Sequence, residues 1–492
     1  MVSLMPNICD HYKNEFESFM QQGNGDKWVS MLRKAAFSRF NDLGFPTTRL
    51  EDWKYTNVSS IAEVPFTLYS GKKFIPPNIS QMPFFKFPGN RLAFLNGCFA
   101  EELSLIENSK ESVIIKSFSK SLFSHHDKIE PHLTHYAGYA DRAFVALNTA
   151  FMNDGAFIYI PDGKVLENPI YIINISVMPQ MVATTVCDRG QAEGHGMAEG
   201  HGMAEGPCGN DHIPLGQHLA WKSNVMPPDA VSFYPRNLIL LGRSSQATVV
   251  EVFVSPFNCN YLTNSVSEIV VGENAILDHY KMQRESQAAF HIASTNVTVK
   301  RDASFSSHSI AMGSAIARNE IHLLLEGEGG IAILNGLYLA DNTQHIDNHT
   351  RIEHIKPRCT SRELYKGVLG GKSRGVFDGK LFVHKDAFKT DAQQVNKNLL
   401  LSDDAHVDAK PQLEIHADDV KCSHGAAVGQ LDTDALFYLR SRGIPEEEAK
   451  SLLTQAFAGE IIDSIKVYLI KDHLSQCVAS RFKESKEMVM TR

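Results

Sequence analysis

The sequence predicts a mainly β protein whose central body is a solenoid of stacked turns. Between residues 141 and 425, short apolar segments follow one another, separated by Gly, Asn and Asp, with no long helix between them. Asn335-Gly336 is the only Asn-Gly pair in this body, whereas a β-sandwich would show frequent two-residue hairpin turns. The segments are often apolar on both faces. These observations favour a solenoid, in which each turn buries its apolar side against its neighbours, and leave a sandwich as the alternative.

The strands of this body are predicted from short apolar runs that lie between turn residues. They are residues 157–160, 169–175, 237–241, 248–254, 267–271, 275–280, 294–299 and 321–325. A Gly-rich insertion near residues 188–212 repeats the letters AEGHGM. Its His195 and His201 resemble a metal-binding tract, but nothing rigid would hold the imidazoles. We therefore interpret the insertion as a loop grown by duplication.

The N-terminal region, residues 1–140, is predicted to be helical and mixed. Apolar residues recur at helical spacing within residues 10–65, and Gly44 interrupts that pattern. Two strands are expected further on, at 91–95 and 112–115. This region therefore differs in texture from the β body that follows it.

The C-terminal region, residues 426–492, is predicted to be helical. Gly443 and Pro445 precede three glutamates, which is typical of a helix start with negative charge at its N-terminus. An apolar stripe continues from Leu436 to Ile465. We expect this unit to cap the open end of the solenoid or to dock into a partner groove.

Composition excludes several classes of protein. The formal net charge of −8 argues against a general nucleic-acid binder, which needs Lys and Arg to neutralise phosphates. Apolar runs fall far short of the roughly 20 residues that a membrane-spanning helix requires. The first residues lack the basic and apolar regions of a secretion signal. We therefore expect a cytoplasmic protein with no membrane partner.

The cysteines do not form a recognised cluster motif. None of the eight is close enough to another to make a CxxC pair, so any metal ligands must be scattered or shared between chains. The most informative stretch is residues 418–425, Asp-Asp-Val-Lys-Cys-Ser-His-Gly. If it is extended, Cys422 and His424 point to the same face, and a thiol beside an imidazole suits a soft metal such as iron. The alternative is a buried cysteine with a hydrogen-bonded histidine at a solenoid corner.

Four other segments resemble functional motifs only superficially. Residues 345–349 contain two histidines without the glutamate of a zinc helix, and we expect these polar groups to satisfy backbone at turns. Residues 367–373 fail the spacing of a phosphate loop and predict a turn, with no nucleotide site. Residues 371–375 match a nucleophile elbow in letters, but β-textured sequence follows instead of a helix. Residues 49–56 are either a recognition surface or a packed tryptophan with flanking charges.

Taken together, these segments resemble the SufB/SufD family of iron–sulfur cluster assembly scaffolds. Trp53, within residues 46–56, and the Lys-Cys-Ser-His-Gly stretch at 421–425 favour the SufD branch over a SufB-like paralogue. The insertion near 188–212 departs from the family. The matching C-terminal segments are residues 363–368, 375–380, 389–394, 398–404, 410–415, 417–425 and 436–444.

The resemblance implies a right-handed parallel β-helix. The lack of a convincing catalytic constellation and the incomplete ligand set predict a non-enzymatic scaffold. The resemblance implies pairing with SufB and binding of the SufC ATPase by the C-terminal helices, where we expect Leu452 and Phe457 to take part. It also implies that His424 and Cys422 hold a transient iron–sulfur cluster shared with SufB. Self-pairing of the isolated chain stays open. A carbohydrate-active β-helix enzyme is the alternative from another class, although such enzymes usually act outside the cytosol and need clustered acids.

Overall fold

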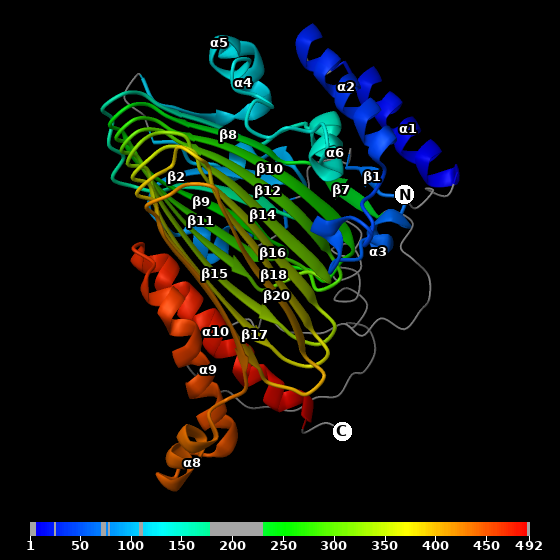
Figure 1. Ribbon diagram of the computed structural model, residues 1–492. Coiled ribbons are helices and arrows are strands. Elements are labelled where there is room, and N and C mark those ends of the chain that lie inside the picture. Colours follow the sequence, from blue (N-terminus) through cyan, green and yellow to red (C-terminus); the bar gives the residue numbers. More distant parts are fainter. Residues whose placement is uncertain are drawn as a thin grey trace, which may run out of the picture.

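The protein is a parallel β-helix with helical regions at its N-terminal and C-terminal ends, as predicted (Figure 1). The computed structural model describes residues 6–23, 26–69, 75–76, 79–107, 112–177 and 230–489. Each coil of the β-helix gives one strand to sheet A and the next strand to sheet B.

Sheet A consists mainly of β5 (Ala156–Ile160), β8 (Arg236–Leu241), β10 (Tyr261–Val271), β12 (Phe290–Val299), β14 (Ile316–Leu325), β16 (His345–His354), β18 (Arg374–Val383) and β20 (His406–Ile415). Sheet B consists mainly of β6 (Ile170–Ile175), β9 (Gln246–Val254), β11 (Ile276–Arg284), β13 (Ser304–Ala311), β15 (Ile331–Ala340), β17 (Thr360–Leu369), β19 (Asp391–Leu400) and β21 (Lys421–Gly429). Five short strands join at the N-terminal end: β1 (Thr67–Leu68), β2 (Asn90–Leu95), β3 (Cys98–Phe99), β4 (Ile114–Ser117) and β7 (Val231–Phe233).

The coils are stacked in register, so that one residue sits above its equivalent in the next coil. Ile316 pairs with His345, His345 with Arg374, and Arg374 with His406. Asn and Asp residues adopt left-handed backbone at the turns between strands, for example Asn342 with φ of 54°. The Gly, Asn and Asp punctuation of the sequence therefore marks the corners of the coils.

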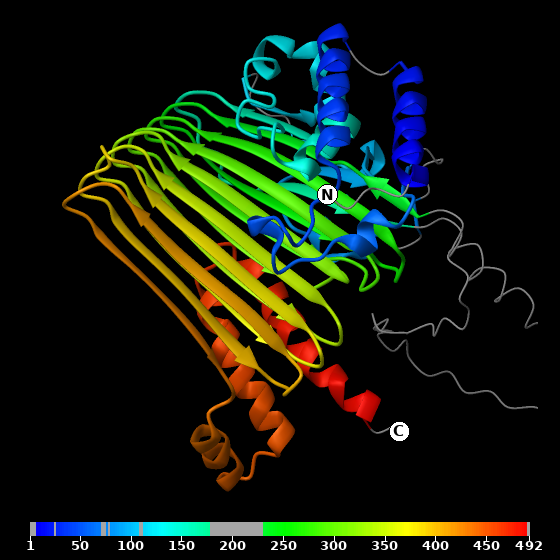
Figure 2. The same ribbon diagram turned by 45° about the vertical axis from the view of Figure 1, so that its right-hand side comes forward.

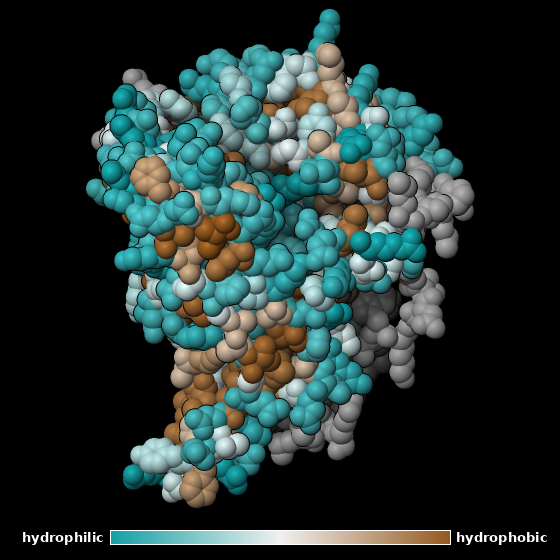
Figure 3. Space-filling view, in the orientation of Figure 1, coloured by the Kyte–Doolittle hydropathy of each residue, from teal (hydrophilic) through white to brown (hydrophobic). Residues whose placement is uncertain are grey.

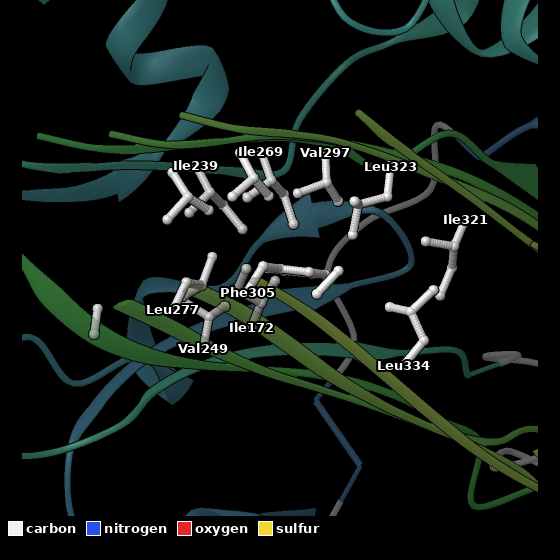
Figure 4. Packing of buried hydrophobic residues seen from close by; sticks show 14 of the residues in the cluster. Ile172, Ile239, Val249, Ile269, Leu277, Val297, Phe305, Ile321, Leu323 and Leu334 are labelled. Atoms are coloured by element: carbon white, nitrogen blue, oxygen red, sulfur yellow. The ribbon is translucent and has the colours of Figure 1, made fainter. Parts of the chain in front are cut away.

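The interior of the β-helix is filled by stacked aliphatic and aromatic side chains. Figure 4 shows residues of sheet A, such as Ile269 and Val297, facing residues of sheet B, such as Leu277 and Phe305. All four are buried. Some strands face the interior on one side and the covering helices on the other, so both of their faces are buried. This explains why segments of the sequence are apolar on both faces.

The interior also contains buried polar side chains that pair with one another. Lys281 Nζ donates to Asn319 Oδ1 at 2.6 Å, and His291 Nδ1 lies 2.7 Å from Glu285 Oε2. Burial lowers the pKa of Lys281 to about 8, while nearby carboxylates oppose the shift. Because several interior positions are polar, β13 lacks the apolar run from which strands such as β9 and β14 were predicted.

The N-terminal helices cover the outer face of sheet A near its first coils (Figure 1). The predicted stop at Gly44 is present, since α2 ends just before it and Gly44 has φ of 61°. The helices are α1 (Pro6–Gln21), α2 (Lys27–Leu43), α3 (Ser59–Ala62), α4 (Phe118–Ser124), α5 (His126–Ile129) and α6 (Ala143–Phe151), with 3-10 turns η1 (Glu51–Trp53), η2 (Ile79–Gln81), η3 (Pro83–Phe85) and η4 (Glu101–Leu103).

The C-terminal helices lie against the outer face of sheet B. They are α8 (Thr433–Ser441), α9 (Glu446–Asp463) and α10 (Tyr468–Val489). Ile461 and Ile462 of α9 pack in the same cluster as Leu337 and Val368 of β15 and β17. These helices therefore cover a side of the β-helix and do not cap its end, contrary to one of the two expectations from the sequence (Figure 2).

Two expectations from the sequence, on the insertion and on membrane-spanning segments, involve residues that the structure describes only in part. The insertion near residues 188–212, with His195 and His201, lies outside the described residues. Among the residues that are described, no helix is long and apolar enough to cross a membrane.

Candidate interface and metal-ligand site at the open end

The last coil forms an uncovered end of the β-helix. β20 and β21 are the terminal strands of sheets A and B, and they lie at the free edge in Figure 2. Val428 is 51% exposed although its partner in the previous coil, Asn398, is buried. Ile415 is 41% exposed above the buried Val383. Positions that are interior in earlier coils are therefore open to solvent here. We call this surface, the inward side of β20 and β21, the open end.

Cys422 and His424 both belong to the open end. The predicted extended segment is part of β21, where Cys422 pairs with Ala392 and His424 pairs with Gln394. Ala392 and Gln394 are buried inside the β-helix. Because side chains two apart on a strand share a face, the thiol and the imidazole lie on the same inward side.

Cys422 is half-buried and packs against the interior. It contacts the apolar cluster of Leu381, Val383 and Ala392, together with Leu413 of β20. Burial raises the pKa of the Cys422 thiol, and the negative charge of Asp391 raises it further. The thiol is therefore protonated at neutral pH, and a metal that binds it would have to displace that proton.

His424 is exposed on the inward side of β21. Gly425 faces the opposite side of the strand, where a Cβ would meet nothing within 4 Å. Among the described residues, no group of three or more His, Cys, Asp or Glu side chains is placed to hold a metal ion. Cys422 and His424 therefore make an incomplete set of two candidate ligands, and their binding of a cluster stays a prediction.

A cavity of about 320 Å³ borders Cys422 on the outer side of sheet B. Its lining includes Arg362, Asp391 and Lys421. Arg362 Nη2 donates to Asp391 Oδ2 at 2.7 Å, and this bond holds the pKa of the Asp391 carboxyl below its usual value. This cavity was not predicted from the sequence. The coil register could have predicted it, since Arg362 pairs with Gln393 and Gln393 with Ser423.

Comparison with known protein families accounts for both halves of the chain. Residues 6–172 match the model of the SufBD protein N-terminal region, and residues 224–457 match the SufBD core domain of SUF system FeS cluster assembly. The chain belongs to the SufBD family of iron–sulfur cluster assembly proteins. The resemblance seen in the sequence is thereby confirmed.

Relatives from several organisms match over most of this SufBD family chain. The iron–sulfur cluster assembly protein SufD of Escherichia coli is 30% identical over 89% of each chain. An iron–sulfur cluster assembly SufBD family protein of Synechocystis is 29% identical over 94% of each chain. The chloroplastic protein ABCI7 of Arabidopsis thaliana is 31% identical over 70% of this chain and 65% of that protein.

The N-terminal SufBD signature, residues 49–56, packs across the outer face of sheet A. The Trp53 ring lies 3.8 Å from the Arg318 guanidinium carbon, and Thr56 Oγ1 donates to Asp347 Oδ2 at 2.5 Å. Glu51 forms an ion pair with Lys410 of β20. Of the two interpretations left open by the sequence, the packed tryptophan is the one that the structure supports. Through Glu51, the segment also contacts β20, the last strand of sheet A.

The two histidines of residues 345–349 both belong to β16: His345 is its first residue and His349 lies in its middle. His349 Nε2 is 3.0 Å from Asp347 Oδ1, and His345 Nε2 is 2.8 Å from Thr56 Oγ1. The expectation that they satisfy backbone at turns was wrong, because they join a side-chain network under the N-terminal segment. The turn expected within residues 367–373 is present, where Ser373 N donates to Gly370 O, and strand β18 follows it.

The C-terminal helices of this SufBD protein expose apolar side chains. Leu452 of α9 is 43% exposed, whereas Phe457 packs beneath Lys366, whose Nζ lies 4.3 Å from its ring centre. Phe437 and Tyr438 of α8 are 72% and 57% exposed, which was not predicted from the sequence. Brown apolar patches in Figure 3 lie over the last strands and over this helical region. We call the exposed side chains Leu452 of α9 and Phe437 and Tyr438 of α8 the helical apolar surface.

Proposed function

We propose that the chain is a non-catalytic scaffold subunit of the SUF machinery that pairs with SufB through its open end. In this proposal it binds the SufC ATPase through the helical apolar surface, and a nascent iron–sulfur cluster forms at the junction with SufB. The observation that carries the proposal is the unfinished last coil, which places Cys422 and His424 beside exposed interior positions.

The physical case for pairing rests on the two edge strands. A terminal strand presents unpaired N–H and C=O groups, and proteins normally blunt such edges with charges, proline or a covering element. Here the inward positions include Leu413, Ile415 and Val428. A second β-helix would continue the stack, pair the edges and cover these apolar groups.

The cluster is cargo that needs ligands from both chains. Two side chains do not complete the coordination of iron, so SufB has to supply the rest. The thiolate of Cys422 and the imidazole of His424 would be this chain's contribution. Because the reaction chemistry would lie with SufC and with the donors of iron and sulfur, the isolated chain should show no ATPase turnover. The cytoplasmic location stays a prediction.

Pairing with SufB is tested by an inward-pointing lysine at the open end. Val428→Lys places a charge where the partner coil would stack, so we expect loss of SufB from a pull-down of the co-expressed proteins. Val165→Lys is the matched control, since Val165 is 58% exposed near the opposite end. Retention of SufB by Val428→Lys, or equal loss in both variants, would remove the open end from the interface.

The ligand role is tested by His424→Ala in the same co-expressed complex. We expect the complex to assemble, with anaerobic iron and sulfide analysis showing loss of the bound cluster. His406→Ala is the control, because His406 is an exposed histidine on the outer face of β20. Wild-type iron and sulfide contents in the His424→Ala complex would exclude His424 as a ligand.

Docking of SufC is tested at Leu452 in preference to Phe457. Leu452→Lys adds a charge to an exposed position, and we expect SufC to be lost while SufB is retained. Leu50→Lys is the control, at an exposed leucine of the N-terminal region. Phe457 packs against Lys366, so a charge there would also disturb the fold. Undiminished SufC binding by Leu452→Lys would place the ATPase elsewhere.

A further inference from the structure

Three polar residues form a ladder that leads from the interior to the open end. Glu363 of β17 pairs with Gln394 of β19, and Gln394 pairs with His424 of β21. All three occupy the inward face, between apolar rungs such as Ala392. Glu363 and Gln394 are buried, and His424 is the exposed last rung. The proposed ligand is therefore stacked directly on a buried amide.

The Gln394 amide is held at one end and unsatisfied at the other. Its Nε2 donates to Glu363 Oε2 at 2.7 Å. A Cβ on Gly379 of sheet A would come within 2.3 Å of the same Nε2, so the amide reaches across the interior into space that a glycine provides. Its Oε1 is buried and has no hydrogen-bond partner among the described residues.

A buried amide oxygen without a donor needs one, and the next rung can supply it. The Nε2 of Gln394 is bound to Glu363, so Oε1 is the amide atom that lacks a partner. The residue stacked on Gln394 in the next coil is His424. The exposed imidazole can rotate about its own side-chain torsions, because no further coil covers the inward face of β21. An imidazole N–H is a suitable donor on the residue that is stacked on Gln394.

We propose that Gln394 is a positioning residue for His424, accepting a hydrogen bond from one imidazole N–H through its amide oxygen. This fixes which ring nitrogen carries the hydrogen and turns the other nitrogen, with its lone pair, toward the partner at the open end. The inference rests on the proposed function for its purpose, although the hydrogen bond itself does not require a cluster. Metal-binding histidines commonly donate their second nitrogen to such a partner, and losing that partner weakens metal binding roughly 10- to 100-fold.

Glu363 sets the direction of the amide in this arrangement. Burial raises the pKa of Glu363 to about 7, so at pH 8 its carboxylate is predominantly ionised and can only accept. The amide must then present Nε2 to Glu363 and Oε1 to the other side. Glu363→Gln keeps an acceptor at this position, whereas Glu363→Met removes it at similar length.

The test measures the tautomer of His424 in the full-length chain at pH 8. Ring ¹⁵N shifts are recorded with labelled histidine, and His424→Ala assigns the signal. We expect one dominant tautomer in the wild type and in Glu363→Gln. In Gln394→Met the ratio of the two tautomers should fall about tenfold, the equivalent of one lost hydrogen bond. Gln393→Met is the matched control, since Gln393 adjoins Gln394 on the opposite, outer face of the strand.

The outcomes separate this inference from the proposed function. A shifted tautomer ratio in Gln394→Met and Glu363→Met, but not in Gln393→Met, supports the positioning role whether or not His424 binds a cluster. An unchanged ratio in both variants overturns it, even if His424→Ala abolishes cluster binding. If Gln394→Met does not fold, Glu363→Met alone decides, because it releases the amide without altering it.

Discussion

The two ends of the β-helix are built from the same coils but are finished in opposite ways. At the N-terminal end, β3 and β4 lie antiparallel to their neighbours β2 and β5, and helices follow directly. At the open end, β20 and β21 remain parallel to the stack and their inward residues are exposed. A reversed strand interrupts the stacking pattern, whereas a parallel edge preserves it for another coil.

At the N-terminal end, the buried carboxylate of Asp154 joins the edge strands of the two sheets. We call this end the locked end. Asp154 accepts from the backbone N–H of Phe99 at 3.2 Å, of Ser119 at 3.2 Å and of Gly155 at 2.9 Å, and from Ser117 Oγ at 2.8 Å. Phe99 belongs to β3 at the edge of sheet B, Ser117 to β4 at the edge of sheet A and Ser119 to α4, while Gly155 follows Asp154 in the chain. One side chain thus ties the edges of the two sheets together inside a single chain.

Among the described residues, antiparallel strands and helices therefore close the β-helix at its N-terminal end only. Solenoids need capping elements for solubility, and an uncovered coil is an aggregation hazard unless a partner covers it. The ladder of Glu363, Gln394 and His424 leads to the open end, where His424 is its last residue. We infer that the open end is retained for assembly.

The largest effect on stability is expected at the locked end. Asp154→Ala leaves three backbone N–H groups and a hydroxyl without their acceptor, so the free energy of unfolding should fall by about 4 kcal/mol. Urea denaturation followed by circular dichroism measures it. Asp404→Ala, at an exposed turn between β19 and β20, should stay within about 0.5 kcal/mol. Similar midpoints for the two variants would show that the carboxylate does not lock this end.

The next effect is a pH dependence that arises from Glu363. Its folded pKa, raised by burial, is about 7, against an ordinary value of 4.5. The folded chain therefore keeps a proton that the unfolded chain has lost. This stabilisation is complete below pH 4.5 and disappears as the pH rises to about 7, a change of about 3 kcal/mol.

The Glu363→Gln variant isolates this dependence, because it has no proton to release. Burial lowers the pKa of His354 and of His308 to about 4, so both destabilise the fold as the pH falls below their ordinary 6.5. Those contributions are common to both proteins. The unfolding free energy of wild type minus that of Glu363→Gln should fall between pH 5 and pH 7.5, and a constant difference would contradict the assignment.

Several strands with apolar residues could be predicted from the sequence, whereas the polar strand β13 could not. Strands such as β10 and β12 were found, at least in part, because Val and Ile recur within them. β13, with the sequence Ser-Phe-Ser-Ser-His-Ser-Ile-Ala, was missed because its inward serines pair with polar partners such as His279. Such pairing depends on which coils are neighbours, and that is decided by the register of the whole stack.

The residues of the candidate site could be predicted from the sequence, but their position in the β-helix could not. Residue types and two-residue spacing were enough to place Cys422 and His424 on one face of a strand. Their position over Ala392 and Gln394 comes from residues thirty positions away, through pairing that no local pattern encodes. The sequence left two alternatives for the C-terminal helices, a cap or a unit that docks into a partner groove, for the same reason. Their apolar stripe indicates that they pack, but not against which face.

The smallest effect on stability is expected at the open end. Val428→Lys replaces a half-exposed side chain on an edge strand, so little apolar contact is lost and the ammonium group can reach water. The free energy of unfolding of the isolated chain should change by less than about 1 kcal/mol. The same variant is expected to lose SufB altogether. A large loss of stability would mean that the contacts of Val428 stabilise the isolated chain, so that the open end is closed like the N-terminal end. A small loss of stability, combined with failed assembly, assigns the contacts of Val428 to the partner.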